Sequence, residues 1–223
     1  PGFQFTVKLP RVFTHERHLA VGAGEMAAFL KAMEPLGEKL GAVLVQLPPS
    51  FQPARHRRVL QDFLALLPER PRFAVEFRDR AWHAASVEKA LRDAGAALCW
   101  NDLTPPGSLD ALGVHATTSD FVYVRLLGDL STKYDAKGER VHVYDRVQWE
   151  RPRDLDAWGD RLRAVSASGA LRDVYVFSNN HYEGYTPATV TALRRRLGLP
   201  EPAPPESTQT APERGGQMDL FPL

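Results

Sequence analysis

The sequence of 223 residues predicts an α/β fold in which helices cover a parallel sheet. Six short apolar runs alternate with segments of helical periodicity along the chain. Each run is continuously apolar and does not alternate with polar residues, which indicates a strand that is buried on both faces. Several runs end in charged or amide side chains, and α/β enzymes bind their ligands beyond the carboxyl ends of such strands.

The clearest strand end lies within residues 73–82. An apolar run begins at Phe73 and is followed directly by Glu76, Arg78 and Asp79. A β-branched and aromatic composition is typical of a buried strand. This segment is therefore expected to deliver an acid and a guanidinium group to the edge of the sheet.

The remaining elements follow from periodicity and from residues that stop helices. A closed (β/α)₈ barrel needs eight strands, and six are expected here: 3–8, 42–47, the strand from Phe73, 96–101, 121–126 and 173–178. Helices are expected from Met26 to a stop at Gly41, from Pro53 to Leu67, from Val87 to Ala94, from Leu155 to Val165, and from a cap at Thr186 to Gly198.

Composition favours one domain with a tail. The formal net charge is +1, so binding of nucleic acid would need a local basic patch. The single cysteine, Cys99, suits a reducing cytoplasm, and neither a membrane-spanning run nor a signal peptide is evident. The chain enters a strand almost at once after Pro1, which indicates a truncated beginning. We expect a cytoplasmic domain over 1–198 and a disordered, proline-rich tail over 199–223.

Polar residues at the strand ends are expected to meet at one mouth of the sheet. Cations beside carboxylates fit an anionic substrate, because arginine offers a rigid fork to phosphate and lysine a point charge. The candidates for catalysis are Glu76 or Asp102 as general base and His181 or His15 as acid. The candidates for substrate binding are Lys8, Arg11, Gln46, Arg78, Arg125, Asn179 and Asn180.

Two alternatives to a substrate site involve the same side chains. Glu76, Arg78 and Arg125 could form an ion network that seals the top of a barrel. His15, Glu76, Asp102 and His181 could supply a metal shell, but no close ligand pair is present and the neighbouring cations would oppose a divalent ion. We therefore expect no cofactor, with a divalent metal as the alternative.

Several stretches resemble the YecE-like family, also called domain of unknown function 72. Members of that family fold as TIM barrels, so the resemblance implies an incomplete TIM barrel here, lacking the first two strands of the family pattern upstream of Pro1. The matching stretches are Lys8–Arg11 with Thr14 and His15, Gln46–Phe51, Val75–Arg78 with Trp82, Tyr123–Leu126, and Asn179 with Asn180.

The chain departs from the family pattern at three positions. Family members often carry histidine where this chain has Asp79 and Leu127, and Ser178 also differs from the pattern. The resemblance therefore transfers no proton-transfer role to position 127.

These residues favour an enzyme that acts on a phosphate-bearing substrate, with phosphodiester cleavage of the DNA-repair type as the leading reaction. One alternative is a sugar-directed hydrolase or isomerase that uses Glu76 and Asp102 as its acid/base pair. The other is a module that binds nucleic acid or another anion without catalysis.

The end of the tail predicts a protein partner. Residues 217–221 read Gln217, Met218, Asp219, Leu220 and Phe221, which resembles the peptide that bacterial replication and repair proteins use to bind the DNA sliding clamp. Exposing apolar side chains to water at the end of a disordered linker is costly unless they bind a partner. The alternative is a tail that folds back onto its own barrel.

Overall fold

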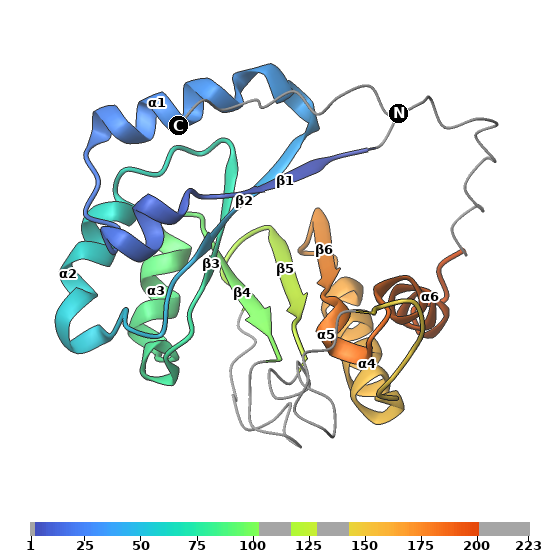
Figure 1. The fold of residues 1–223 in the computed structure, drawn as a ribbon. Helices are drawn as coiled ribbons and strands as arrows, with labels where there is room; N and C mark the ends of the chain where they lie inside the picture. The colour runs from blue at the N-terminus through green and yellow to red at the C-terminus, as the bar shows by residue number, and fades with distance from the viewer. Residues whose placement is uncertain (1–2, 103–116, 129–142, 201–223) are drawn as a thin grey trace, which may run out of the picture.

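A computed structural model describes residues 3–102, 117–128 and 143–200. Within these residues the chain forms one curled sheet of six parallel strands, in the spatial order β1-β2-β3-β4-β5-β6 (Figure 1). The predicted α/β fold, an incomplete TIM-type barrel, is thereby confirmed. The strands are β1 (Phe5–Lys8), β2 (Leu40–Gln46), β3 (Arg72–Glu76), β4 (Ala97–Asn101), β5 (Phe121–Leu126) and β6 (Asp173–Ser178).

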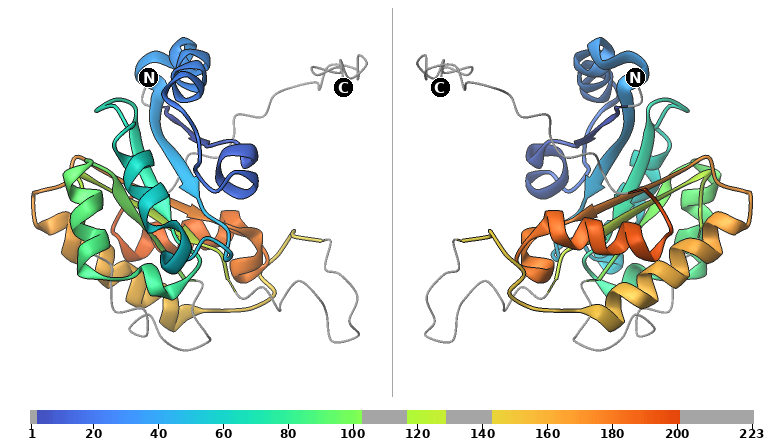
Figure 2. Two further views of the ribbon diagram at one scale, coloured as in Figure 1. Left: turned by 90° about the vertical axis from the view of Figure 1, so that its left-hand side faces the viewer. Right: turned by 90° about the vertical axis from the view of Figure 1, so that its right-hand side faces the viewer.

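Helices cover the outer face of this sheet. Figure 2 shows α4 and α6 lying against one another beside β6, while α2 and α3 cover the strands nearer the N-terminus. The long helices are α1 (Ala23–Met33), α2 (Pro53–Leu64), α3 (Ala85–Asp93), α4 (Pro152–Ala167) and α6 (Thr186–Arg196). The short ones are η1 (Val12–Glu16), η2 (Glu34–Lys39), η3 (Arg80–Trp82) and α5 (Asn180–Glu183).

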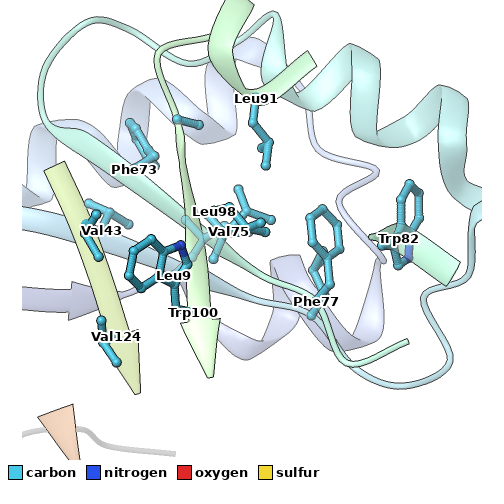
Figure 3. Packing of buried hydrophobic residues seen from close by; sticks show 14 of the residues in the cluster. Leu9, Val43, Phe73, Val75, Phe77, Trp82, Leu91, Leu98, Trp100 and Val124 are labelled. Carbon is cyan, nitrogen blue, oxygen red and sulfur yellow. The ribbon is translucent and has the colours of Figure 1, made fainter. Parts of the chain in front are cut away.

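The main hydrophobic core lies between the sheet and these helices. Val75 of β3 and Leu98 of β4 lie side by side beneath Leu91 of α3 (Figure 3). Trp82 is 1% exposed, stacks on Phe77 and donates an Nε1–H hydrogen bond of 2.7 Å to the carbonyl of Phe51. The strands β2, β3, β4 and β5 are almost wholly buried, as predicted, whereas β1 and β6 at the two ends of the strand order are only partly buried.

The inner face of the curled sheet is filled by small residues on one wall and large ones on the other. Ala42 and Ala74, on β2 and β3, are fully buried, and Tyr123 and Tyr175 come from β5 and β6. A Cβ atom on Gly41 would lie only 2.8 Å from the Tyr175 hydroxyl. The aromatic rings fit inside because Gly41, Ala42 and Ala74 leave space opposite them.

Arg72 joins the two walls of the sheet beneath the mouth. Its guanidinium donates to the carbonyl of Gly41 at 3.2 Å, to Asp173 at 2.7 Å and to the hydroxyl of Tyr175 at 2.5 Å. The side chain is 8% exposed. A buried guanidinium is tolerated here because each branch of its fork has a partner.

The two expected open edges are confirmed, since β1 and β6 end the strand order. Side chains nevertheless connect the two sides across the interior. Tyr175 donates to Gln4 at 2.7 Å and Tyr123 donates to Thr6 at 3.3 Å. The curl of the sheet therefore brings β1 opposite β5 and β6.

The helix expected to run from Met26 to a stop at Gly41 is shorter than predicted. It ends at Met33, and the chain continues as a 3₁₀ segment with Pro35 in its first turn. Gly37 has a φ of +49°, which breaks the helical path. Gly41 is not a helix stop but the second residue of β2. Apolar spacing overestimated the helix because a proline cannot supply the interior N–H that the helix needs.

Two short helical turns lie outside the helices predicted from the sequence. Residues 12–16 form the π-helical turn η1, and residues 180–183 form α5 directly after β6. Both turns lie at the carboxyl end of the sheet and each carries a histidine. Local periodicity is too short in such turns to be detected.

Gly128, directly after β5, allows α5 to pack closely on the strand end. It has a φ of +74°, and a Cβ atom there would lie 2.2 Å from the carbonyl oxygen of His181 and 2.5 Å from Cα of Tyr182. Both the backbone conformation and the space thus require glycine.

We expect Gly128→Ala to destabilise the fold more than Gly169→Ala. Gly169 also has a positive φ, +67°, but a Cβ atom added to it would meet no other atom within 4 Å. Both substitutions incur the cost of a left-handed alanine, about 1–2 kcal/mol, and overpacking adds about 1–3 kcal/mol at position 128 alone. Urea denaturation of the two variants measures the difference; equal losses would contradict the packing argument.

Candidate functional site

The centre of the candidate site is the carboxylate of Glu76 at the end of β3. The side chain is 0% exposed, whereas those of Arg78 and Arg125 are 17% and 19% exposed. Arg78 Nε donates to Oε1, and Arg125 Nη1 donates to Oε2 at 2.5 Å. Each oxygen of the buried carboxylate therefore accepts a hydrogen bond from a guanidinium group. These partners offset the free-energy cost of removing the charge from water.

Gln46 connects this ion network to β1. Its Oε1 accepts hydrogen bonds from Arg125 Nη1 at 3.0 Å and from Lys8 Nζ at 2.9 Å. Gln46 and Glu76 are partners in the β2–β3 register, so their side chains rise from the same level of the sheet. Residues from β1, β2, β3 and β5 thus meet at one mouth, as predicted for parallel strands.

Positive charge exceeds negative charge at this mouth. Burial lowers the pKa of Lys8, and the charge of Arg125 lowers it further, with Arg78 and Arg11 adding to the effect; only Glu76 acts in the opposite direction. One buried carboxylate thus faces several cations whose fields overlap. Such an arrangement stabilises a bound anion.

His15 lies at the edge of the same positive field, on η1. Its Nδ1 is 2.8 Å from Thr14 Oγ1, a fully buried hydroxyl that orients the ring. Burial lowers the pKa of His15, and the charges of Arg11, Lys8 and Arg78 lower it further. The imidazole is thus held neutral, the form in which it accepts a proton.

The carboxylate of Asp102 accepts hydrogen bonds from the main chain. It accepts the amide N–H groups of Leu127 at 2.5 Å and Gly128 at 2.9 Å. Burial raises the pKa of Asp102, and these backbone hydrogen bonds act against that rise. The carboxylate therefore holds the end of β4 against the end of β5.

The residues after β6 also hold the backbone in place. Asn179 Oδ1 accepts the amide of His181 at 3.0 Å and caps α5, and Asn180 Oδ1 accepts the amide of Thr186 at 3.0 Å. The Nδ1 atom of His181 lies 3.1 Å from the hydroxyl of Tyr144. These contacts place the three residues at the carboxyl edge of the sheet, but none joins them to the Glu76 network.

Two residues of the mouth were not among the predicted site residues. Asn101 is the register partner of Arg125 on β4 and is 7% exposed. Phe177 is the register partner of Arg125 on β6 and is 37% exposed. Alternation along the strand 173–178 could have indicated Phe177, because it follows Tyr175 by two positions and therefore faces the same side.

The part of the chain that the structure describes contains no group of three or more His, Cys, Asp or Glu side chains that could hold a metal ion. The oxygens of Glu76 and Asp102 are directed at guanidinium and amide groups instead. Within the same residues, no helix is both long and apolar enough to cross a membrane.

Comparison with known families identifies the chain. The model of the family "Protein of unknown function DUF72" matches residues 1–214. The chain belongs to this family. The resemblance noted in the sequence is thereby confirmed. The DUF72 match extends from the first residues into the proline-rich segment beyond α6.

Relatives within DUF72 carry no described activity in their names. The UPF0759 proteins YecE of Escherichia coli K12 and of Escherichia coli O157:H7 are each 31% identical over 93 residues, which is 42% of this chain. The matched stretch spans 34% of the length of either relative.

Solved DUF72 structures share the fold. A family protein from Thermotoga maritima MSB8 is 27% identical, with a TM-score of 0.66 over 86% of this chain and 72% of that one. A family protein from Enterococcus faecalis V583 is 19% identical, with a TM-score of 0.65 over 89% of this chain and 75% of that one. The curled α/β sheet described above is therefore the DUF72 architecture.

The electrostatic account of the mouth predicts that Arg11→Ala raises the pKa of His15. Arg11 is the cation with the largest effect on that histidine, and removing a nearby positive charge favours the protonated ring. Titration of the His15 ring protons by NMR measures the shift. Arg57→Ala, an exposed substitution on α2, is the control; an unchanged His15 pKa in Arg11→Ala would contradict the account.

Proposed function

We propose that this DUF72 chain binds the phosphate group of its substrate at the mouth formed by Lys8, Arg78 and Arg125. The observation that carries the proposal is the excess of positive charge at this mouth: burial lowers the pKa of Lys8 and of His15, and the charges of neighbouring cations lower both further. A phosphate placed among these groups relieves the repulsion between them. Guanidinium and ammonium donors are also the groups that bind phosphate most strongly.

In this proposal Glu76 positions the arginines and does not transfer the proton. Both of its oxygens accept charge-assisted hydrogen bonds, and its side chain is fully buried. A carboxylate so engaged is a poor base, because protonation would leave two guanidinium groups without their partner. The same holds for the acid/base pair of a sugar hydrolase, since Asp102 also accepts two hydrogen bonds.

We propose phosphodiester hydrolysis as the reaction. His15 takes a proton from the attacking water, whose oxygen forms the new bond to phosphorus while the bond to the leaving oxygen breaks. Lys8, whose lowered pKa makes its ammonium a better donor, supplies the proton to the leaving oxygen. The arginines offset the charge that builds on the phosphoryl oxygens.

Substitutions at Lys8 and His15 should separate binding from chemistry. We expect Lys8→Met to weaken binding of inorganic phosphate by about tenfold or more, since a charge-assisted contact contributes about 1.5–3 kcal/mol. We expect His15→Gln to retain phosphate binding but to reduce hydrolysis of bis(4-nitrophenyl) phosphate by about 10²–10⁴-fold. Calorimetry and release of nitrophenol measure the two effects.

Lys39→Met is the matched control for Lys8→Met. Lys39 lies directly before β2, at the end of that strand opposite to the mouth. Phosphate affinity that is equal in both lysine variants would contradict the proposed site. Binding without any turnover of phosphodiester probes would instead identify a non-catalytic anion-binding module.

We further propose that the tail tethers the domain to a bacterial DNA sliding clamp and thus directs it to DNA repair. Residues 217–221 lie outside the described part of the chain, and the support is their sequence alone. Leu220 and Phe221 would fill an apolar pocket, with Gln217 at its rim. A tether raises the local concentration of a near-neutral domain at DNA without a strong basic field of its own.

The double substitution Leu220→Ala, Phe221→Ala should abolish binding to a sliding clamp and leave the melting temperature unchanged. Burial of each side chain is worth about 1.5–3 kcal/mol, so an affinity of about micromolar is expected after ordering costs. Surface plasmon resonance of the full chain on immobilised clamp measures it, and a peptide of residues 213–223 should compete. No binding of the unaltered chain at tens of micromolar would contradict the tether.

A further inference from the structure

An exposed aromatic ring lies beside the proposed phosphate site. Phe177 is paired in register with Arg125, so the two residues occupy the same level of neighbouring strands, about 5 Å apart. Both belong to the inner face of the curled sheet, like Tyr123 and Tyr175. An aromatic side chain on an inner wall is usually covered, but Phe177 is 37% exposed.

The ring of Phe177 rests on a buried neighbour. It stacks on Tyr123, with 4.9 Å between ring centroids and 25° between planes. Tyr123 is itself fixed, because it is 3% exposed and its hydroxyl donates to Thr6 across the interior at 3.3 Å. Phe177 lies on the edge strand β6 and is 37% exposed, so a supported and partly accessible ring is present as a platform for stacking.

We propose that Phe177 stacks on the nucleobase of a nucleotide whose phosphate is held by Arg125 and Lys8. This assignment rests on the proposed phosphate site and names the class of its substrate. A nucleotide carries a planar π-system and an anion in one molecule. The platform and the cations therefore match two parts of one ligand.

The composition of the platform also sets its selectivity. Phe177 and Tyr123 present carbon faces, and the Tyr123 hydroxyl is directed away to Thr6. Stacking on such a face accepts any base, because every base has a π-face and no hydrogen-bonding edge is read. The expected ligand is thus a nucleotide or single-stranded nucleic acid bound with little base preference.

Binding of 2′-deoxyadenosine 5′-monophosphate and of 2-deoxyribose 5-phosphate by calorimetry tests this inference. The two probes share the phosphate and the sugar and differ in the base. We expect the nucleotide to bind more tightly to the unaltered chain. Phe177→Ala should weaken nucleotide binding by about tenfold and leave binding of the sugar phosphate within twofold, whereas Phe177→Trp should retain both.

Phe5→Ala is the matched control, since Phe5 is 43% exposed on β1 and its ring contacts Phe3, not Tyr123. Quenching of 2-aminopurine deoxynucleotide fluorescence, lost in Phe177→Ala and kept in Phe5→Ala, would report the stacking directly. Thermal unfolding establishes that each variant folds.

The outcomes separate the inference from the proposed function. If neither probe binds the unaltered chain, the phosphate site itself is overturned. If both probes bind equally well, or if Phe177→Ala weakens both by the same factor, the phosphate site stands and the base platform is overturned.

Discussion

A carboxylate that is wholly removed from water at the end of β3 governs the arrangement of the mouth. The charge of Glu76 must be matched, and the two guanidinium groups that match it come from Arg78 on the same segment and from Arg125 two strands away along the sheet. Arg125 in turn shares the oxygen of Gln46 with Lys8. One buried charge thus orders side chains from four strands. Two guanidinium groups and the ammonium of Lys8 surround this one carboxylate, which leaves the surplus of positive charge on which the proposed phosphate site rests.

Below this layer, small residues on one wall of the sheet face large aromatic residues on the other. Gly41, Ala42 and Ala74 leave space that Tyr123 and Tyr175 fill, and Arg72 ties β3 to β6 through Asp173. This lower layer sets the curl of the sheet, because a larger side chain at position 41 would meet the Tyr175 hydroxyl. The curl then determines which side chains face one another at the mouth. Support for the functional residues therefore comes from a layer that takes no part in the proposed chemistry.

Sequence patterns predicted strands well and helix ends less well. The strands at 121–126 and 173–178 have the predicted bounds, because β-branched and aromatic residues mark both of them, although β5 is almost wholly buried and the edge strand β6 is not. The helix after Met26 was extended too far because apolar spacing continues through the 3₁₀ segment that contains Pro35 and Gly37. Lys8, Gln46, Glu76, Arg78 and Arg125 could be expected to meet because parallel strands end on one side of a sheet. Three further polar residues also follow predicted strands in the sequence but bind the backbone instead: Asn179, Asn180 and Asp102.

The class of fold, the family and the set of polar side chains at the strand ends follow from the sequence alone, because apolar runs and strand-end positions are properties of local order. Which of these side chains are partners follows only from the tertiary structure. The hydrogen bonds between Glu76 and Arg125, the neutral state of His15 and the exposed ring of Phe177 all depend on distances between strands far apart in the chain. Such distances are set by how the sheet curls and packs, and Coulomb forces and burial act through space and not along the sequence.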